Sequence, residues 1–301
     1  MKNKSIISEP LNKEINALLK DLFEEVNFIN ILRNNIWIAG GFSRLIGICN
    51  FNINSKPYKE VITEYLFEKG GDIDLFSNSE DTLNKSISLI DPFIQSSFYD
   101  LFSNVFSKTF TFDTKKVNKQ GFYSKIKMQF VSKFFYKNIN DCLNSFDFTN
   151  CKFGIEFKDN NFYIHYDKEA LKYEKENKLN LEHCNSPLLA KRIMKYISSK
   201  GLELYKSKRN NDILRKYYYK VVTKNWDNVF TENMEDSNFN VGALGVNRLE
   251  RIIDMSQEDL VIFIGQLSIP DFDFSNQGYG HYIMVGEVDW ASKLILEKNN
   301  A

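Results

Sequence analysis

The chain has 301 residues, enough for one large domain or about two of ordinary size at roughly 150 residues each. Hydrophobic residues make up 43% and charged residues 26%, a composition that excludes a disordered, collagen-like or fibrous chain. Lys plus Arg and Asp plus Glu number 39 each, and this net charge of zero, taken alone, argues against a nucleic-acid-binding protein.

The first half of the chain carries helix and strand signals in turn. Apolar residues recur every three or four positions across 11–33, which predicts an amphipathic helix. A short apolar strand follows at Ile36–Ala39 and ends at the pair Gly40-Gly41. The further elements expected in this half are a helix over 42–48, a strand at 72–76, and a strand at 124–131 in which apolar and polar residues alternate.

The second half begins with short strands and then becomes helical. Ser186 and Pro187 predict the start of a helix that ends before Gly201. The other expected elements are a helix over 138–145, strands at 146–149, 152–157 and 162–166, and a helix over 212–224. We therefore expect an α+β domain over 1–166 and a mainly helical domain over 167–301, basic first and then acidic.

The cysteines and the hydropathy favour a reducing, aqueous compartment. Four cysteines are present without the C-x-x-C spacing of zinc or redox sites. The charged start MKNKSIISEP is unlike a secretory signal, and no apolar run approaches the ~20 residues of a membrane span. We expect a cytoplasmic protein without a membrane partner, in the host cytoplasm if the chain is viral. Its oligomeric state is left open.

The residues with the clearest chemistry are Asp72 and Asp74. Residues two apart in a strand share a face, so both carboxylates point the same way while Ile73 and Leu75 point into the core. Such a pair is tolerated when a divalent cation lies between the carboxylates, because Mg²⁺ prefers hard oxygen ligands. An Asp-x-Asp pattern alone is usually a solvated turn, so its meaning depends on the residues around it.

The glycine pair and a third aspartate supply that context. Gly40 and Gly41 allow close backbone approach, and the following helix start, with Ser43 as hydroxyl donor and Arg44 beside it, is suited to a triphosphate. Asp147, on the predicted strand 146–149, is the candidate for a third carboxylate, the simpler alternative being an edge-strand carboxylate. Three aspartates would complete a site for two metal ions.

The order of these motifs along the chain resembles the nucleotidyltransferase superfamily, which includes DNA polymerase β, poly(A) polymerases and CCA-adding enzymes. The motifs are an apolar strand, a Gly-Gly pair, an Asp-x-Asp pair and a later single aspartate. The resemblance covers 36–150 and implies a mixed sheet with flanking helices. It matches Gly40 and Gly41 to phosphate contacts, and Asp72, Asp74 and Asp147 to the ligands of two Mg²⁺ ions, with Mn²⁺ as an alternative. The implied reaction transfers a nucleoside monophosphate from a nucleoside triphosphate to an acceptor hydroxyl and releases pyrophosphate.

The spacing between the glycine pair and the aspartate pair differs from that of the superfamily, and the sequence contains a second Asp-x-Asp pair. About 30 residues separate Gly41 from Asp72, where the superfamily has roughly a dozen, so an insertion over about 50–69 is expected. The alternative pair in Asp271–Phe274 follows a poor glycine turn, and no third carboxylate is obvious downstream of it. Motifs of other enzyme classes, such as GxxxxGK[ST], GxGxxG, HExxH and GxSxG, are absent from the sequence.

A second resemblance concerns the helix predicted over 186–200. Met128-Gln129-Phe130, Ser145-Phe146-Asp147 and the run from Pro187 to Gly201 are similar to phage- and virus-encoded nucleotidyltransferases. Lys191, Arg192 and Lys195 would present cations to the triphosphate, and Tyr196 a ring on which a base can stack. The alternative is an ordinary solvated helix face, with Tyr196 in the core.

The zero net charge conceals an uneven distribution. Residues 114–137 hold seven lysines and no acidic residue, and residues 191–224 hold eleven basic residues against two acidic ones. Residues 225–301 hold four basic residues against thirteen acidic ones. The basic middle, interleaved with tyrosines, favours an RNA 3′ end as acceptor. The alternatives are a protein or small-molecule acceptor, a non-catalytic nucleotide or nucleic-acid binder, and a structural protein.

Overall fold

The computed structural model describes 6–26, 28–53, 56–90, 102–103, 107–117, 123–185 and 189–223. The chain divides into two compact units, Met1–Glu176 and Asn177–Ala301. The candidate pair in Asp271–Phe274, the acidic stretch 225–301 and the expected cap residues Ser186 and Pro187 lie outside the described residues.

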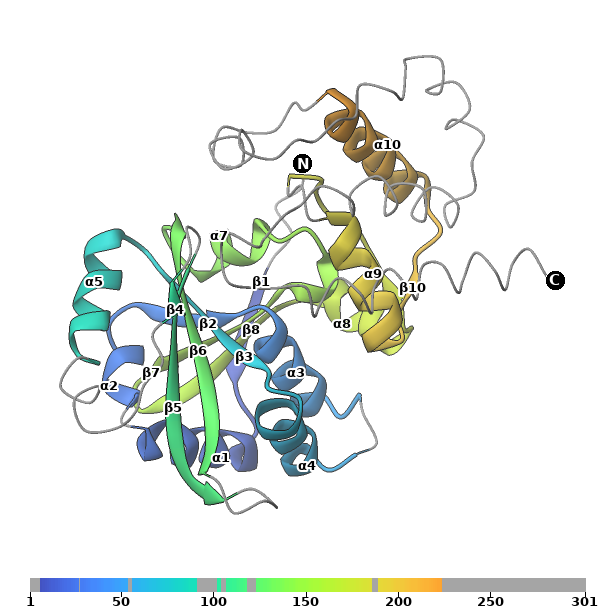
Figure 1. The fold of residues 1–301 in the computed structure, drawn as a ribbon. Helices are drawn as coiled ribbons and strands as arrows, with labels where there is room; N and C mark the ends of the chain where they lie inside the picture. Colours follow the sequence, from blue (N-terminus) through green and yellow to red (C-terminus); the bar gives the residue numbers. More distant parts are fainter. Residues whose placement is uncertain are drawn as a thin grey trace. The chain divides into compact units, whose positions relative to one another are not determined.

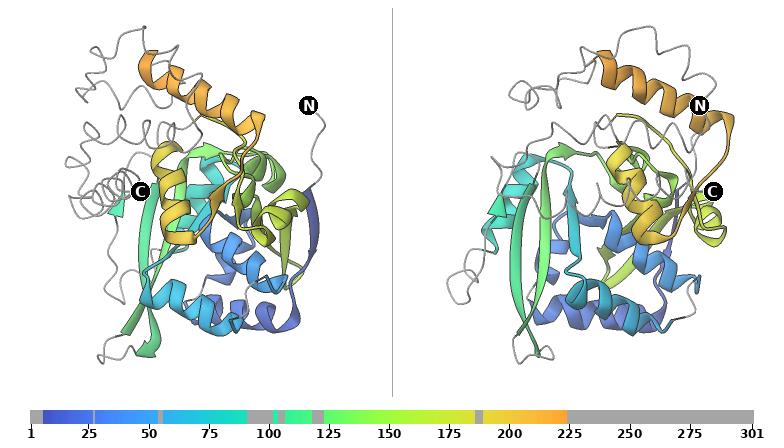
Figure 2. Two further views of the ribbon diagram at one scale, coloured as in Figure 1. Left: turned by 90° about the vertical axis from the view of Figure 1, so that its right-hand side faces the viewer. Right: turned by 45° about the vertical axis from the view of Figure 1, so that its right-hand side comes forward.

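The first unit is built on one mixed sheet (Figure 1). Its described strands follow the order β1-β8-β7-β2-β3-β6-β5-β4. Neighbours pair antiparallel, except β3 and β6, which are parallel. β5 and β6 form a long hairpin (Figure 2). The strands are β1 Ile6–Pro10, β2 Ile36–Ala39, β3 Asp72–Ser77, β4 Phe102–Ser103, β5 Ser107–Val117, β6 Tyr123–Phe135, β7 Phe153–Lys158 and β8 Asn161–Asp167.

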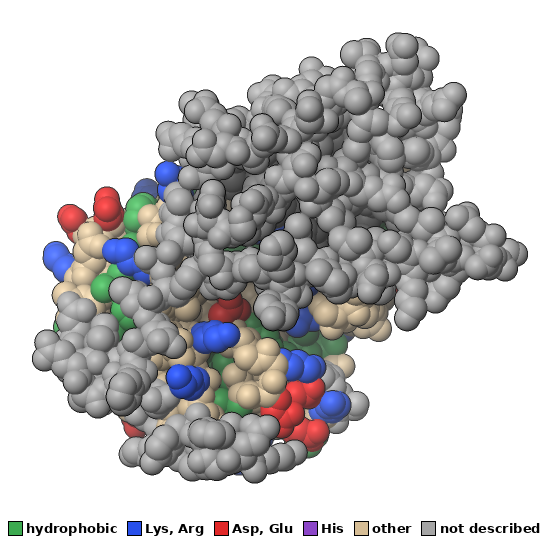
Figure 3. Space-filling view, viewed as in Figure 1, with side chains coloured by type: hydrophobic (Ala, Val, Ile, Leu, Met, Phe, Trp, Pro, Cys, Tyr) green, Lys and Arg blue, Asp and Glu red, His purple; other side chains and the backbone are tan. Residues whose placement is uncertain are grey.

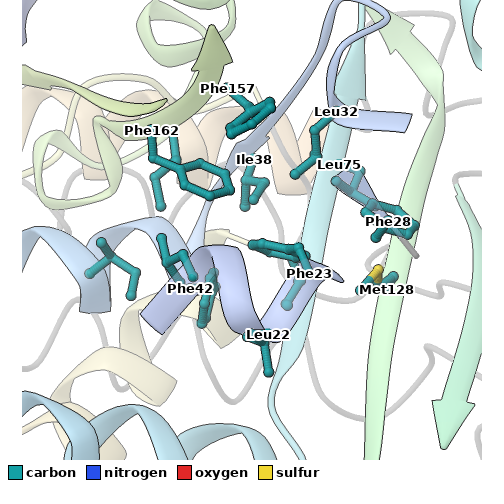
Figure 4. Close-up of a cluster of buried hydrophobic side chains, with 14 of the residues drawn as sticks. Leu22, Phe23, Phe28, Leu32, Ile38, Phe42, Leu75, Met128, Phe157 and Phe162 are labelled. Carbon is teal, nitrogen blue, oxygen red and sulfur yellow. The ribbon is translucent and has the colours of Figure 1, made fainter. Parts of the chain in front are cut away.

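Helices flank this sheet, which confirms the predicted α+β class. The largest core joins apolar side chains of α1 and α2 to one face of the strands. Figure 4 shows side chains of this core pointing toward one another, and the ring centroids of Phe23 and Phe162 lie 5.7 Å apart. The helices of the unit are α1 Lys13–Glu25, α2 Ile29–Leu32, α3 Gly41–Asn50, α4 Tyr58–Thr63, α5 Glu80–Ser88, α7 Ile139–Asn144 and α8 Lys168–Lys175, with short turns η1 Glu64–Glu68 and η2 Thr149–Cys151.

A smaller core covers part of the opposite face. Trp37 and Ala39 of β2 and Phe76 of β3 pack there against Ile139, Cys142 and Leu143 of α7. Gly154 of β7 makes room for this helix, since a Cβ there would lie 2.8 Å from Ile139 Cδ1. Alternation along β2 and β3 therefore separates the two cores, and α7 covers the second face beside the predicted aspartate pair.

Several predicted elements are confirmed, with differences that have physical causes. The strands at 36–39, 72–76, 124–131, 152–157 and 162–166 are present, and the hairpin turn between the last two uses positive φ at Asp159 and Asn160. The single helix expected over 11–33 is two helices. The strand expected over 146–149 is wrong: these residues form a bend, an isolated bridge at Phe148 and the start of a 3₁₀ turn. The structure adds β1, α4, α5 and β5 to the predicted elements.

The second unit is described through residue 223. Its described elements are, in chain order, β9 (Lys178–Leu179), α9 (Leu189–Lys200), β10 (Glu203–Leu204) and α10 (Lys208–Thr223), and β9 and β10 pair in parallel. Gly201 follows α9 with φ 65°, as expected of a C-cap glycine. α8 belongs to the first unit, so the division falls after this helix and past the expected boundary at 166/167. The described helices include none long and apolar enough to span a bilayer.

One packing contact generates a stability prediction. A Cβ at Gly47 of α3 would lie 2.6 Å from Cε1 of the fully buried Phe153. Gly to Ala within a helix usually gains about 1 kcal/mol, but overpacking a rigid ring costs about 1–3 kcal/mol. We expect Gly47→Ala to lower the free energy of urea unfolding by up to about 2 kcal/mol, and to be neutral or stabilising in a Phe153→Leu background. A stabilised single variant would contradict this packing.

Candidate functional site

The turn after β2 brings the backbone close to a carboxylate. Gly40 has φ 89° and ψ −145°, a conformation that favours glycine. A Cβ at Gly40 would lie 2.7 Å from Oδ2 of Asp74, so a larger residue would collide with that side chain. α3 begins at Gly41, where backbone N–H groups of the first turn form an end suited to an anion.

Asp72 and Asp74 lie on one face of β3, as predicted. Ile73 and Leu75 alternate with them and are fully buried in the larger core on the other face. Asp72 is exposed and Asp74 half-buried. The Cα atoms of residues two apart along a strand are about 6–7 Å apart, so the two carboxylates are close enough to interact. They repel unless a cation or hydrogen-bond donors lie between them.

Asp74 has different neighbours on its two sides across the sheet. Ala39 of β2 and Gln129 of β6 are its register partners, and register partners share a face. Ala39 is completely buried and offers no polar side-chain atom. The next row of the same face pairs Asp72 with Lys127, an exposed lysine of β6. The aspartates therefore have an amide and a cation on the β6 side.

The carboxamide of Gln129 bridges the two aspartates. With its nitrogen facing them, it donates to Asp74 Oδ1 at 2.9 Å and to Asp72 Oδ2 at 3.3 Å, and its oxygen accepts from Ser107 Oγ of β5 at 2.5 Å. The reverse orientation would point an amide oxygen at two carboxylates, so hydrogen bonding assigns the nitrogen to this side. Gln129 thus supplies donors where two like charges meet.

Tyr65 packs beneath the glycines. It lies in η1, a single π-helical turn of the kind found frequently at functional sites. A Cβ at Gly41 would lie 3.1 Å from its hydroxyl, and one at Gly71 would overlap its ring. The hydroxyl donates to the backbone carbonyl of Asp72 at 3.1 Å. Burial, and then the charges of Asp72 and Asp74, raise the pKa of Tyr65, so the phenol stays a donor at neutral pH.

Ser43 and Arg44 were both predicted to bind nucleotide, and both are buried in α3. Arg44 Nε and Nη2 donate to the two carboxylate oxygens of Glu174 at 2.8 and 2.6 Å. Asn150 Nδ2 donates to the same carboxylate at 2.8 Å. Ser43 Oγ has no hydrogen-bond partner among the described residues. The Arg44 guanidinium therefore joins α3 to α8, and this geometry favours a structural role for it.

Asp147 lies in the bend after α7, not on a strand. It is 6% exposed. Burial mainly raises the pKa of Tyr136, and the Asp147 charge adds to that shift. Burial likewise raises the pKa of Cys142 in α7, with a smaller contribution from Asp74. Both aspartates therefore influence groups on or beside α7.

The expected three-carboxylate group is not assembled. Within the described ranges, no three His, Cys, Asp or Glu side chains come together as a group that could hold a metal ion. Asp72, Asp74 and Asp147 all fall within those ranges. The expected two-ion arrangement would need such a group of three carboxylates. The pair Asp72 and Asp74 does fit one divalent cation, because it offers hard oxygen donors on one face.

Lys191, Arg192, Lys195 and Tyr196 lie in α9 of the second unit. Arg192 and Lys195 are exposed and Tyr196 is half-buried, while Leu189 and Ile193 are fully buried, as the helical spacing predicts. Their assignment to nucleotide binding stays a prediction.

Sequence reasoning missed two residues of the site. The sequence motif that contains Gln129 assigns it no role, although its alternation with Ile126, Met128 and Phe130 places it on the polar face of its strand. Its position beside Asp74 depends on the parallel pairing of β3 and β6, for which no local signal exists. Tyr65 lies in the insertion expected over 50–69. The pair Gly70-Gly71, which follows this insertion, is a sequence signal that a side chain can lie close to the backbone there.

The residues of this site lie in a segment of the chain that matches a protein family. A family model described as "Gabija anti-defense 2 family protein" matches residues 9–176, more than half of the chain. The chain therefore belongs to the Gabija anti-defense 2 family. The matched residues include β2, the glycine turn, both aspartates and Gln129. No curated protein matches the chain in sequence.

Solved structures similar to the chain are members of the superfamily that its motifs resemble. The Thermotoga maritima CCA-adding enzyme in complex with a tRNA is 13% identical with a TM-score of 0.45, over 87% of this chain and 54% of that one. A CCA-adding enzyme with ATP is 12% identical with a TM-score of 0.46, over 87% and 55%. The chain spans about half the length of these enzymes. At such scores the likeness says nothing about this chain's activity.

The Arg44 network generates the next prediction. The side chains of Arg44 and Glu174 are 8% and 3% exposed. Removing one partner of a buried pair leaves an uncompensated charge and costs about 3–5 kcal/mol. We expect Arg44→Ala to lower the free energy of unfolding by that amount. The control is Lys172→Ala, which removes an exposed pair with Glu176 worth less than about 1 kcal/mol. Equal losses in the two variants would exclude a structural role for Arg44.

Proposed function

We propose that this protein is a metal-dependent nucleotidyltransferase that moves a nucleoside monophosphate from a nucleoside triphosphate to an acceptor hydroxyl, with release of pyrophosphate. The observation that carries the proposal is the contact between the glycine turn and the aspartate pair: a Cβ at Gly40 would lie 2.7 Å from Asp74 Oδ2. The helix start that would bind phosphate thus lies within a few ångströms of Asp74, one of the two carboxylates that would bind the cation.

Each residue of the site has a proposed role in this reaction. Asp72 and Asp74 would hold Mg²⁺ or Mn²⁺, which supplies charge neutralisation for a triphosphate. The backbone amides from Gly41 to Ser43 would donate to the β- and γ-phosphates. Tyr65 keeps the glycine segments in place through its hydrogen bond to the Asp72 carbonyl. Lys191, Arg192, Lys195 and Tyr196 of α9 are proposed separately as nucleotide contacts of the second unit.

Two features bear on the acceptor. Lysines of the basic stretch 114–137 lie on the β5–β6 hairpin, and Lys125 and Lys127 are exposed on the aspartate face of β6. Figure 3 shows Lys and Arg side chains beside Asp and Glu on the uncovered part of one face. The lysines of the hairpin favour an RNA acceptor, whereas the family's description favours an acceptor that is a component of the Gabija defence system. We propose that the reaction acts in the cytoplasm against that system.

The central test combines the full chain, Mg²⁺, each labelled nucleoside triphosphate and mixed acceptors. We expect Asp72→Asn with Asp74→Asn to lower transfer at least about 10²–10³-fold, the size seen when preorganised charge is removed from a site. Asp159→Asn is the matched control, because Asp159 is an exposed residue of the β7–β8 turn. Transfer that persists in the double variant would refute the proposal, and metal-dependent nucleotide binding without transfer would favour a non-catalytic binder.

The same assay decides the role of Asp147. Because the described residues do not assemble three carboxylates, we expect Asp147→Asn to keep transfer within about tenfold of wild type. A loss of about 10²-fold or more, the usual contribution of a general base, would mean that Asp147 takes part in the reaction.

Identifying the labelled product separates the acceptors. An RNA acceptor predicts label on nucleic acid and binding that weakens steeply as salt is added, since phosphate contacts release counterions. Label on a protein, with a flat salt response, would favour a protein component of the defence system instead.

A further inference from the structure

Gln129 occupies the position beside Asp74 on the aspartate face. The parallel register sets Asp74 opposite Gln129, and the antiparallel register with β2 sets it opposite Ala39. Adjacent strands are about 4.8 Å apart, so both side chains lie within immediate reach of Asp74 across the sheet. One is apolar and the other is a neutral amide.

The hydrogen bonds of this amide are directional. Gln129 donates to Asp74 Oδ1 and Asp72 Oδ2, while Ser107 Oγ, on a residue only 3% exposed, donates to its oxygen. The bridge fixes the two carboxylates relative to each other and lowers their repulsion. Asp74 Oδ2, the other oxygen of that carboxylate, faces Gly40, the side assigned to the triphosphate.

We propose that Gln129 is the positioning residue of the aspartate pair, and that by standing at the place of a third carboxylate it limits the site to a single divalent cation. The proposal rests on the proposed nucleotidyltransferase function and sharpens it, because the superfamily resemblance implied two ions held by three aspartates. A glutamate of nearly the same shape at this position would complete a three-carboxylate group.

Counting bound ions tests the proposal without relying on catalysis. Mn²⁺ is titrated into the full-length protein without nucleotide, and bound Mn²⁺ is followed by electron paramagnetic resonance and equilibrium dialysis. We expect one ion per chain in wild type and two in Gln129→Glu. Gln129→Leu, which keeps the bulk but has no donor, should bind one ion about tenfold more weakly, as is common for residues that orient metal ligands.

Two controls separate positioning from general effects. Lys125→Glu adds negative charge on the same face of β6, at a residue whose register partner is Asp113 and not an aspartate of β3, and should bind one ion. Urea unfolding shows whether each variant folds. If Gln129→Leu does not fold, the number of ions bound by Gln129→Glu tests the proposal.

The outcomes distinguish this proposal from the function on which it rests. Two ions in wild type, no ion in wild type, one ion in Gln129→Glu, or unchanged affinity in Gln129→Leu would each overturn the role of Gln129. One ion in wild type and two in Gln129→Glu, with no nucleotidyl transfer under any condition, would support the role of Gln129 and refute the proposed function.

Discussion

The alternation of side chains along β3 is the constraint on which the site depends. Ile73 and Leu75 are fully buried, and burial of such residues contributes about 1.5–3 kcal/mol each. Two carboxylates bridged by one amide nitrogen lie about 5–6 Å apart, and near a protein surface they repel by about 3 kcal/mol. Because the free energy gained by burying Ile73 and Leu75 exceeds this repulsion, the strand can hold Asp72 and Asp74 together on the opposite face. A bound cation would relieve the repulsion between the two carboxylates.

Neighbouring strands adapt to this charged pair. The glycine turn after β2 approaches Asp74 so closely that a side chain there would collide with it. β6 contributes Gln129, whose amide donates to both carboxylates. The helix start proposed to bind phosphate and the carboxylates proposed to bind a cation are therefore parts of one arrangement, and the sheet register sets the distance between them. Arg44, buried against Glu174, contributes to this arrangement by fixing α3 rather than by facing a ligand.

Local patterns predicted the parts of the fold that are governed by local physics. β2, β3 and β6 carry clear apolar runs or alternation, and Gly40-Gly41 requires a turn, so these elements and the aspartate face could be read directly. Asp147 was assigned to a strand because Phe146 and Phe148 flank it, yet this spacing also fits the observed bend, where Phe148 is buried. Strand pairing is a tertiary property, so the position of Gln129 beside Asp74 could not be derived from its sequence neighbours.

The most direct measurement is a crystal structure of the full chain grown with Mn²⁺ and a non-hydrolysable nucleoside triphosphate, with the ion located by its anomalous scattering. We predict one Mn²⁺ peak bound by Asp72 and Asp74, with the triphosphate against the backbone amides that follow Gly40. A nucleotide bound elsewhere, or a metal ion that avoids both aspartates, would contradict the assignment of this face as the nucleotide site.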